Sequence, residues 1–575
     1  MLSNSVVAAM VASVYVLTLV LQLNPTLPLN PTGLVPIATT VGLFYALHLT
    51  AVFYIALVLR QLFARELFSP GWVSVGVLTW LVASSAVAGA GLMWANLQTF
   101  ELVLEPSTIR QITNGAITLV VSAAFLVFVA LLRAHMGSAA RPIWGVLFFV
   151  TVGGSMAAPL AARGRATPPP LEAHPIDVSL GVSAESTARV TIIAVDAGSL
   201  DFITGATAEG RLPNFGRVLD AGAVMHLATL HPTSAEAVWA AVATGKLPQK
   251  NGVRSAGSYR RPGGGDPILL LPDYCFSHVL VRFGFLVEQP HSSATLRTRT
   301  LWNIVGAAGV SVGVVGWSLT YPAPAVLGYL VSDMYHRLVS TPSGIDDPSS
   351  LYPADLQTVA FHAVEAEAPG EVRVMPGASL EPRYQTPART DRIYERIARE
   401  LAVTRPVRLT ILRYQSLDPI GHYFLRYANP ASFGDVTDDE RRQLGPVLEQ
   451  HYAVIDDAIG RAIASLGADD LLVVVSGYGM EPLGLVKRLL ERVVGDPELS
   501  GTHEAAPDGF LMVYGGPAAR GRLATRASVV DLVPTLLYFL GLPIGRDMDG
   551  YVRTDLFQRP FTDARPITYI PTYDR

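Results

Sequence analysis

The first third of the chain contains five apolar runs that carry no charged residue, at 6–23, 34–59, 72–97, 112–132 and 143–160. Each run is close to the roughly 20 residues that an α-helix needs to cross a bilayer. Five such runs in succession exceed the pattern of a soluble core. We therefore expect a transmembrane region of about five spans in residues 1–165, with the membrane lipid bilayer as its partner.

Arginines in the connections between these runs predict the orientation of the spans. Arg60 and Arg65 follow the second run, and Arg133 and Arg141 follow the fourth, so both pairs lie on the same side of the membrane. Short basic loops remain in the cytoplasm. With an odd number of spans, the chain after residue 160 then lies outside. We expect an integral protein of the cell membrane whose soluble domain is extracytoplasmic.

The rest of the chain has the pattern of a soluble domain behind a linker. Residues 166–188 include three consecutive prolines and have no hydrophobic periodicity, which is typical of a linker. Between residues 189 and 575, apolar β-branched runs such as VTIIAVD, VSVGVVGW and DLLVVVSG alternate with helical stretches. This alternation predicts an α/β domain with a doubly wound, mostly parallel sheet. Ligands of such sheets bind at the carboxyl ends of the strands.

Charge and cysteine content exclude several functions for this domain. The chain has 43 basic and 47 acidic residues, and the arginines of the membrane region leave the remainder mildly acidic, without a basic cluster. Nucleic-acid binding depends on a basic surface and is not expected. The single cysteine, Cys275, rules out an intrachain disulfide and a cysteine-based zinc site.

Polar residues that follow predicted strands could hold a metal ion. Asp418 and His422 lie four residues apart across a Pro-Gly turn after the run LTILRYQ, and His503 precedes the run FLMVY. An Asp-His-His set with an open fourth position is typical of a catalytic zinc site, although each histidine alone could be a surface residue. Asp196, at the end of VTIIAVD, is a further candidate ligand or catalytic acid, but an aspartate in this place is more often a helix N-cap.

Five blocks follow one another between about residues 189 and 557. They are the stretch from IIAVDAGSLDFI to VWAAVATGKLPQKNGV, then SLDPIGH, VVVSGYGM, GTHEAAPDGF and SVVDLVPTLLYFLGLPIGRDMDG. Together they resemble the alkaline phosphatase superfamily, nearest its type I phosphodiesterase/nucleotide pyrophosphatase branch. The resemblance implies an alkaline phosphatase-like fold that hydrolyses phosphoesters. It also implies that Asp418, His422 and His503 bind one of two metals, usually zinc, and that Asp196 binds the other.

Two parts of the family pattern are missing. The Asp-His pair of the second metal site reads Gly477 and Tyr478, and the position of the Thr or Ser nucleophile is Ala235. The neighbouring Thr233 and Ser234 are the candidates for a displaced catalytic nucleophile. We expect one zinc ion and no ordinary second site. Tyr478 is expected in the space of the second metal, donating a hydrogen bond to Asp196.

Three functions are compatible with these observations. The first is a membrane-anchored, metal-dependent hydrolase of a phosphoester or phospholipid-type small substrate. The second is a non-catalytic or ligand-binding pseudoenzyme of the same fold, as the loss of nucleophile and second-metal ligands suggests. The third is a lipid headgroup phosphotransferase, because phosphoethanolamine transferases share the layout of five spans and an external domain, although they use a Thr nucleophile. A single metal can generate hydroxide from water, so we favour the first.

Overall fold

The computed structural model describes residues 1–64, 74–136, 141–161, 163, 186–339, 347–367 and 380–574. Contacts divide the chain into two compact units. The first consists of Met1–Pro170 and Gly257–Pro290, and the second of Leu171–Ala256 and His291–Arg575. Most of the linker expected at 166–188 lies outside the described residues, as does Arg65.

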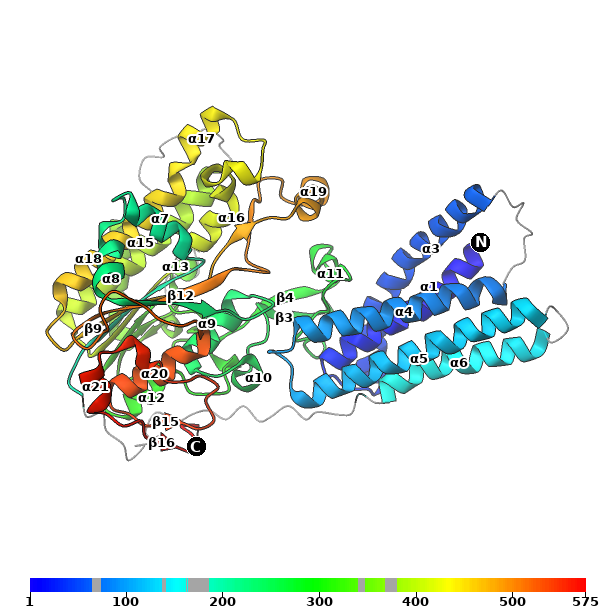
Figure 1. Ribbon diagram of the computed structural model, residues 1–575, viewed down its shortest axis with the longest axis horizontal. Coiled ribbons are helices and arrows are strands. Elements are labelled where there is room, and N and C mark those ends of the chain that lie inside the picture. Colours follow the sequence, from blue (N-terminus) through cyan, green and yellow to red (C-terminus); the bar gives the residue numbers. More distant parts are fainter. Residues whose placement is uncertain are drawn as a thin grey trace. The chain divides into compact units, whose positions relative to one another are not determined.

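The first unit contains the five apolar helices that the sequence predicts (Figure 1). Its helices are α1 (Leu2–Leu23), α2 (Pro31–Ile37), the π-helical turn η1 (Ala38–Gly42), α3 (Leu43–Ala64), α4 (Val75–Thr99), α5 (Pro106–Met136) and α6 (Arg141–Ala161). The segments long and apolar enough to cross a membrane are Leu2–Leu23, Pro31–Phe63, Val75–Thr99, Pro106–Leu132 and Ile143–Ala161. The prediction of five apolar helices is confirmed.

A segment from the middle of the chain belongs to this first unit, although the sequence analysis placed it inside the soluble domain. It consists of β3 (Gly257–Arg260), α11 (His278–Arg282) and β4 (Val287–Pro290), with β3 and β4 antiparallel. Asn24, after α1, donates from Nδ2 to the Leu270 carbonyl at 2.8 Å and accepts from the Leu270 amide at 2.9 Å. Asn96 of α4 makes the same pair of bonds with Asp273, at 3.1 and 2.8 Å. We call Gly257–Pro290 the docked insert.

The second unit is built on a ten-stranded sheet with the order β13-β2-β12-β9-β1-β8-β5-β6-β7, in which β14 also pairs with β2. The strands are β1 (Val190–Val195), β2 (Ala223–Ala228), β5 (Val312–Val315), β6 (Gly328–Val331), β7 (Leu351–Tyr352), β8 (Leu409–Tyr414), β9 (Leu471–Tyr478), β12 (Asp508–Gly515), β13 (Arg522–Leu523) and β14 (Ala527–Ser528). The central strands β9, β1, β8, β5 and β6 are parallel, whereas β12 and β7 run antiparallel to their neighbours. Small two-stranded pairs are formed by β10 (Glu481–Pro482) with β11 (Gly501–Thr502) and by β15 (Ile544–Gly545) with β16 (Tyr569–Ile570).

Helices cover both faces of this sheet, so the predicted doubly wound α/β fold class is confirmed (Figure 1). Along β1, Ile192 and Ala194 belong to the core beneath one set of helices, and Ile193 and Val195 to the core beneath the other. This alternation follows from the two-residue period of a strand. One face carries α9 (Ala235–Thr244), α12 (Leu301–Ala307) and α20 (Leu532–Phe539). The other carries α7 (Leu200–Ala208), α8 (Pro213–Ala221), α15 (Glu381–Thr404), α16 (Leu417–Ala428) and α18 (Pro446–Ser465). The remaining helices are α10 (Pro248–Asn251), α13 (Tyr335–Val339), α14 (Gln357–Ala366), α17 (Asp438–Leu444), α19 (Leu485–Val494) and α21 (Arg559–Asp563).

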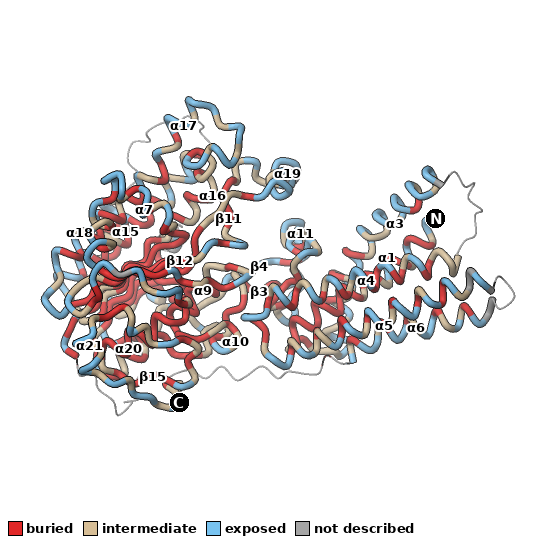
Figure 2. Tube along the Cα trace, viewed as in Figure 1, coloured by how far each residue is buried: buried red, intermediate tan, exposed pale blue. Residues whose placement is uncertain are grey.

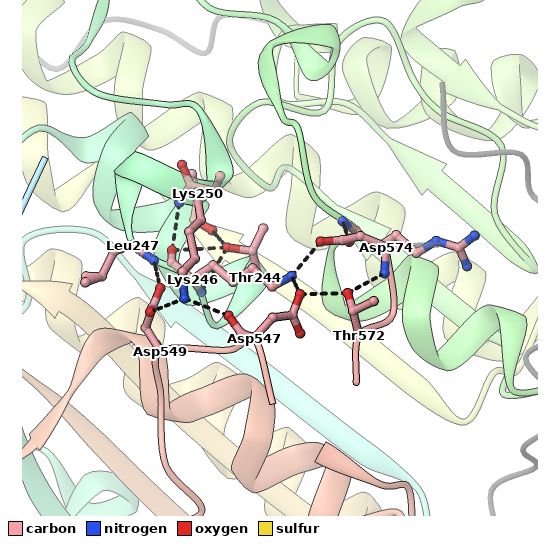
Figure 3. A network of polar contacts seen from close by, with 11 residues as sticks. Thr244, Lys246, Leu247, Lys250, Asp547, Asp549, Thr572 and Asp574 are labelled. Atoms are coloured by element: carbon pink, nitrogen blue, oxygen red, sulfur yellow. Dashed lines mark hydrogen bonds and ion pairs between the residues drawn. The ribbon is translucent and has the colours of Figure 1, made fainter. Parts of the chain in front are cut away.

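Lys246, a buried residue just after α9, binds Asp547 and Asp574 near the C-terminal end of the chain (Figure 3). The ammonium group of Lys246 lies 2.5 Å from a carboxylate oxygen of Asp547 and 2.5 Å from one of Asp574. Its side chain is only 4% exposed. Nearby, Asp549 accepts from the Leu247 amide at 2.8 Å. A buried ammonium group needs such partners, and this network therefore holds the C-terminal end of α9 in place.

Candidate metal centre

The structure brings Asp418, His422 and His503 together next to the carboxyl end of β8. One ligand atom from each residue lies within 4.8 Å of the others. The Nε2 atoms of His422 and His503 lie 3.8 and 3.6 Å from Oδ1 of Asp418. The segment between Asp418 and His422 is not a Pro-Gly turn, as the sequence suggested, but the start of α16. Proline is tolerated in a first helical turn, and a spacing of four residues then places both side chains on one face.

Backbone carbonyls bind the other ring nitrogen of each histidine. Nδ1 of His422 lies 2.8 Å from the carbonyl oxygen of Gly501, and Nδ1 of His503 lies 3.3 Å from that of Thr233. A carbonyl can only accept, so each Nδ1 carries a proton, and in the neutral ring Nε2 is the nitrogen whose lone pair is left for a metal ion. Oδ1 of Asp418 is buried and has no hydrogen-bond partner within the described part of the chain. These three atoms fit the donor set of a zinc-like ion.

Two glycines allow the histidines to approach each other. A Cβ atom on Gly421 would lie 2.5 Å from Sδ of Met480, and one on Gly501 would lie 2.7 Å from the carbonyl oxygen of Gly421. A larger residue at position 501 would push β11 away from α16, and one at position 421 would displace the Met480 side chain. The close packing of these two elements therefore sets the distance between His422 and His503.

A buried polar cluster holds the start of α16. Oδ1 of Asp391, in α15, accepts from the Gln415 amide at 3.0 Å, and its Oδ2 accepts from the Ser416 amide at 3.3 Å. Nε2 of His451 lies 2.5 Å from the Ser416 hydroxyl oxygen. Asp391 is 1% exposed. Among the described residues, its carboxylate makes no hydrogen bond to any of the three candidate ligands. Its position indicates that it orients the backbone that carries Asp418.

Asp196 lies at the end of β1 and pairs with Arg413 of the adjacent strand β8. Nε of Arg413 donates to Oδ1 of Asp196 at 2.8 Å, and Nη2 donates to Oδ2 at 2.5 Å. Both side chains are almost fully buried. Burial opposes the charge of the guanidinium, but the carboxylate of Asp196 outweighs it and raises the pKa of Arg413. Asp196 thus already has a cationic partner within the protein.

Tyr478 does not make the hydrogen bond that the sequence analysis predicted. Both carboxylate oxygens of Asp196 are bound by Arg413, and the Tyr478 hydroxyl is buried without a partner among the described residues. Its ring centroid lies 5.2 Å from that of His503. Burial raises the pKa of Tyr478 well above 10, so the phenol is neutral. The prediction was wrong because it considered only the residues that replace the family's ligands, and not a cation from a neighbouring strand.

The space for a side chain at position 477 is filled. A Cβ atom on Gly477 would lie 2.4 Å from Cγ1 of Val238, in α9. An aspartate there would require α9 to move. Glycine in place of the family's aspartate therefore allows α9 to pack closely against β9.

The turn before α9 carries both candidate nucleophiles. The Thr233 hydroxyl is buried and donates to the Leu230 carbonyl at 2.8 Å. Ser234 is the N-cap of α9, where its hydroxyl oxygen accepts from the Ala237 amide at 3.3 Å. The same hydroxyl donates to Glu236 at 3.3 Å. The Thr233 carbonyl accepts a hydrogen bond from His503, one of the candidate metal ligands. The Ser234 hydroxyl is instead bound to the carboxylate of Glu236.

Sequence reasoning missed Glu236 as a member of this site, and it did not predict that Arg413 pairs with Asp196. Burial raises the pKa of Glu236 to about 7, and the charges of Arg413 and Asp418 both act on it. The signals were present in the sequence. Arg413 interrupts an apolar strand, and a buried arginine needs an anionic partner. Glu236 is an acidic residue in the first turn of an otherwise apolar helix.

The chain belongs to the type I phosphodiesterase/nucleotide pyrophosphatase family, whose model matches residues 190–525. That range includes every residue of the site described above. The resemblance predicted from the five sequence blocks is confirmed. Members of this family are phosphodiesterases and pyrophosphatases, and the fold is that of a phosphoester hydrolase.

Two solved structures of murine ectonucleotide pyrophosphatase/phosphodiesterase 5 are similar to this chain, one of them an inactive variant in complex with AMP. In both cases the identity is 12%, the match covers 64% of this chain and 100% of the other, and the TM-score is 0.37. No curated protein matches the chain.

Proposed function

We propose that the chain is a membrane-anchored, metal-dependent hydrolase of phosphoesters that uses one zinc ion, held by Asp418, His422 and His503. One observation carries this proposal: the two Nε2 lone pairs and the unpartnered Asp418 oxygen face one another. The family supports a phosphoester as substrate. The five apolar helices make a phospholipid-type small molecule a candidate within that class. The five apolar helices support membrane anchoring, and the arginine bias supports an extracytoplasmic catalytic domain at residues 189–575.

A zinc ion in this site would polarise a phosphoryl oxygen and lower the pKa of a bound water. The chain's own residues perform the remaining tasks. Arg413 neutralises Asp196, so this carboxylate does not need a second ion. Glu236, with a pKa near 7, is suited to accept a proton in the attack and to return it to the leaving group.

Two nucleophiles are compatible with these groups. In the first route, water attacks the phosphorus and no covalent intermediate forms. In the second, Ser234 attacks and Glu236 takes its proton, which the 3.3 Å hydrogen bond between them supports. Thr233 is the weaker candidate, because its hydroxyl donates to a backbone carbonyl. We favour water, since the family position of the nucleophile is Ala235.

The test uses the full chain in detergent. Metal content and turnover of an aryl phosphodiester are measured before and after chelation, and again after zinc is restored. We expect about one equivalent of metal per chain and turnover that disappears and returns with it. Two equivalents, or turnover that survives complete metal removal, would contradict the one-metal proposal. A covalent phospho-adduct on Ser234 would establish the second route, and one on Thr233 would identify that residue as the nucleophile.

A pseudoenzyme is the second candidate function. The packing of Val238 into the position 477 space supports it, because this half of the site has been closed and not merely altered. Metal binding without turnover of any phosphodiester or phosphomonoester would favour this alternative.

A further inference from the structure

The helix α19 exposes its apolar side. Five of its side chains, all aliphatic, have large exposed fractions: Leu485 77%, Val486 83%, Leu489 66%, Leu490 41% and Val493 76%. Figure 2 shows α19 as an exposed coil of the second unit. Surface helices of soluble domains normally direct their apolar stripe toward the core. In α19 this arrangement is reversed.

The charged side of α19 attaches it to the domain. The guanidinium carbon of Arg488 lies 4.9 Å from the ring centroid of Phe433. Arg492 pairs with Asp435 at 2.6 Å, and Lys487 pairs with Glu504. These contacts fix the helix with its apolar face outward. These contacts therefore hold the five aliphatic side chains listed above in an exposed position, and we call them the exposed face.

This helix is connected directly to the candidate metal centre. It is inserted between β10 and β11, which pair through Glu481–Thr502 and Pro482–Gly501. The carbonyl of Gly501 binds His422, and His503 follows Thr502. On the helix itself, Lys487 binds Glu504, the residue after His503. Whatever the apolar face docks on is thus held near the two histidine ligands.

The chain itself indicates what covers the face. The second unit is joined to the unit with the membrane helices without any spacer, since Gly257 follows Ala256 and His291 follows Pro290. A bilayer is therefore always within reach of this unit. Amphipathic helices with aliphatic side chains on one face and basic ones on the other lie in the headgroup region of membranes.

We propose that α19 is an interfacial helix that docks its apolar face on the lipid surface of the membrane in which the chain is anchored. Docking holds the candidate metal centre at the headgroup level. The docking rests on the membrane anchoring in the proposed function, and its effect on catalysis rests also on the proposed hydrolase activity.

Fluorescence quenching tests the docking directly. In a Cys275→Ser background, a single cysteine replaces Val486, or Val403 as the matched control, because both valines are 83% exposed. Each is labelled with a small fluorophore, and the full chain is placed in nanodiscs with nitroxide-labelled phosphatidylcholine. We expect at least severalfold stronger quenching at position 486 than at position 403. Equal quenching at the two positions would overturn the proposal, and so would self-quenching between labels at 486 that indicates a second copy.

A second pair of variants provides a test if the Cys275→Ser chain does not fold. Val486→Glu with Leu489→Glu places two charges on the exposed face, and Val403→Glu is the control. With the wild-type cysteine retained, we expect the double variant to reduce turnover of a lipid phosphodiester in nanodiscs about tenfold and to leave turnover of a soluble aryl phosphodiester unchanged. An equal loss on both substrates, or no loss on either, would contradict docking. If the wild type turns over neither substrate, only the proposed hydrolase activity fails, and the quenching comparison decides the docking.

Discussion

Arg413 binds both carboxylate oxygens of Asp196 from the next strand of the sheet, at 2.8 and 2.5 Å. In the family pattern, this aspartate is expected to bind a metal. Here a guanidinium occupies its lone pairs, in a region where both side chains are nearly inaccessible to water. The aspartate that the family pattern assigns to a second metal is therefore half of a buried ion pair in this chain.

The Arg413→Met variant tests this pair. It leaves the carboxylate of Asp196 buried without a counter-charge, which typically costs about 3–5 kcal/mol of stability. The measurement is denaturant unfolding in detergent, with Arg405→Met as control because the pair of Arg405 and Asp355 is exposed. We expect only a small effect from the control. Similar losses in the two variants would show that the buried pair has no special role.

Metal content should depend on His503 and not on Tyr478. We expect His503→Ala to lose both the bound metal and any turnover, because only two ligands would remain. Tyr478→Phe should keep about one equivalent of metal and the stability of the wild type, since the phenol group has no hydrogen-bond partner in the described structure. Elemental analysis of both purified variants checks this, and loss of metal from the Phe variant would disprove it.

Asp391 should affect the metal without touching it. Its carboxylate holds the two amides that precede α16, and removal of such an outer partner typically weakens metal affinity 10–100-fold. We expect Asp391→Asn to behave in this way in a zinc competition titration. The control is Asp456→Asn, which removes a similarly buried carboxylate that accepts from the Asn214 and Phe215 amides. If both variants bind zinc equally, Asp391 does not position the site.

The pH dependence of stability should report Glu236. Burial raises its pKa from 4.5 to about 7 in the folded chain. The folded state therefore binds this proton more tightly than the unfolded state does, and stability falls as the pH rises from 4.5 through 7. We expect Glu236→Gln to reduce this slope in thermal unfolding of the chelated protein. An unchanged slope would show that another group is responsible.

Sequence patterns could predict the parts of this protein that depend on local spacing. The apolar helices follow from run length, and Asp418 with His422 follows from a four-residue spacing in a recognisable block. The partner of Asp196 could not be found in this way, because Arg413 is distant in sequence and becomes its neighbour only through the pairing of β1 with β8. The assignment of Tyr478 failed for the same reason.

The sequence analysis did not predict that the docked insert packs with the first unit, and the physical reason is a different one. Its residues Ile268, Leu270 and Leu271 have the pattern of an ordinary buried segment, and such a pattern does not identify the surface that buries it. The partners are Asn24 and Asn96, which lie at the ends of two of the apolar helices and bind backbone groups of the insert. Because these bonds reach only backbone groups of the insert, residues of any type could make them. The sequence of the insert therefore does not reveal them.

The docked insert also determines how the second unit can be separated from the five apolar helices. Cutting the chain before residue 189 would leave Tyr259, Leu271 and Leu286 without the helices that bury them, so such a fragment should aggregate. Gly257 pairs with Pro290 across the base of the insert, and directly paired residues of antiparallel strands lie about 5 Å apart. A short glycine bridge from Ala256 to His291 could therefore replace residues 257–290. Preparation of the second unit alone would need this second excision as well as the first.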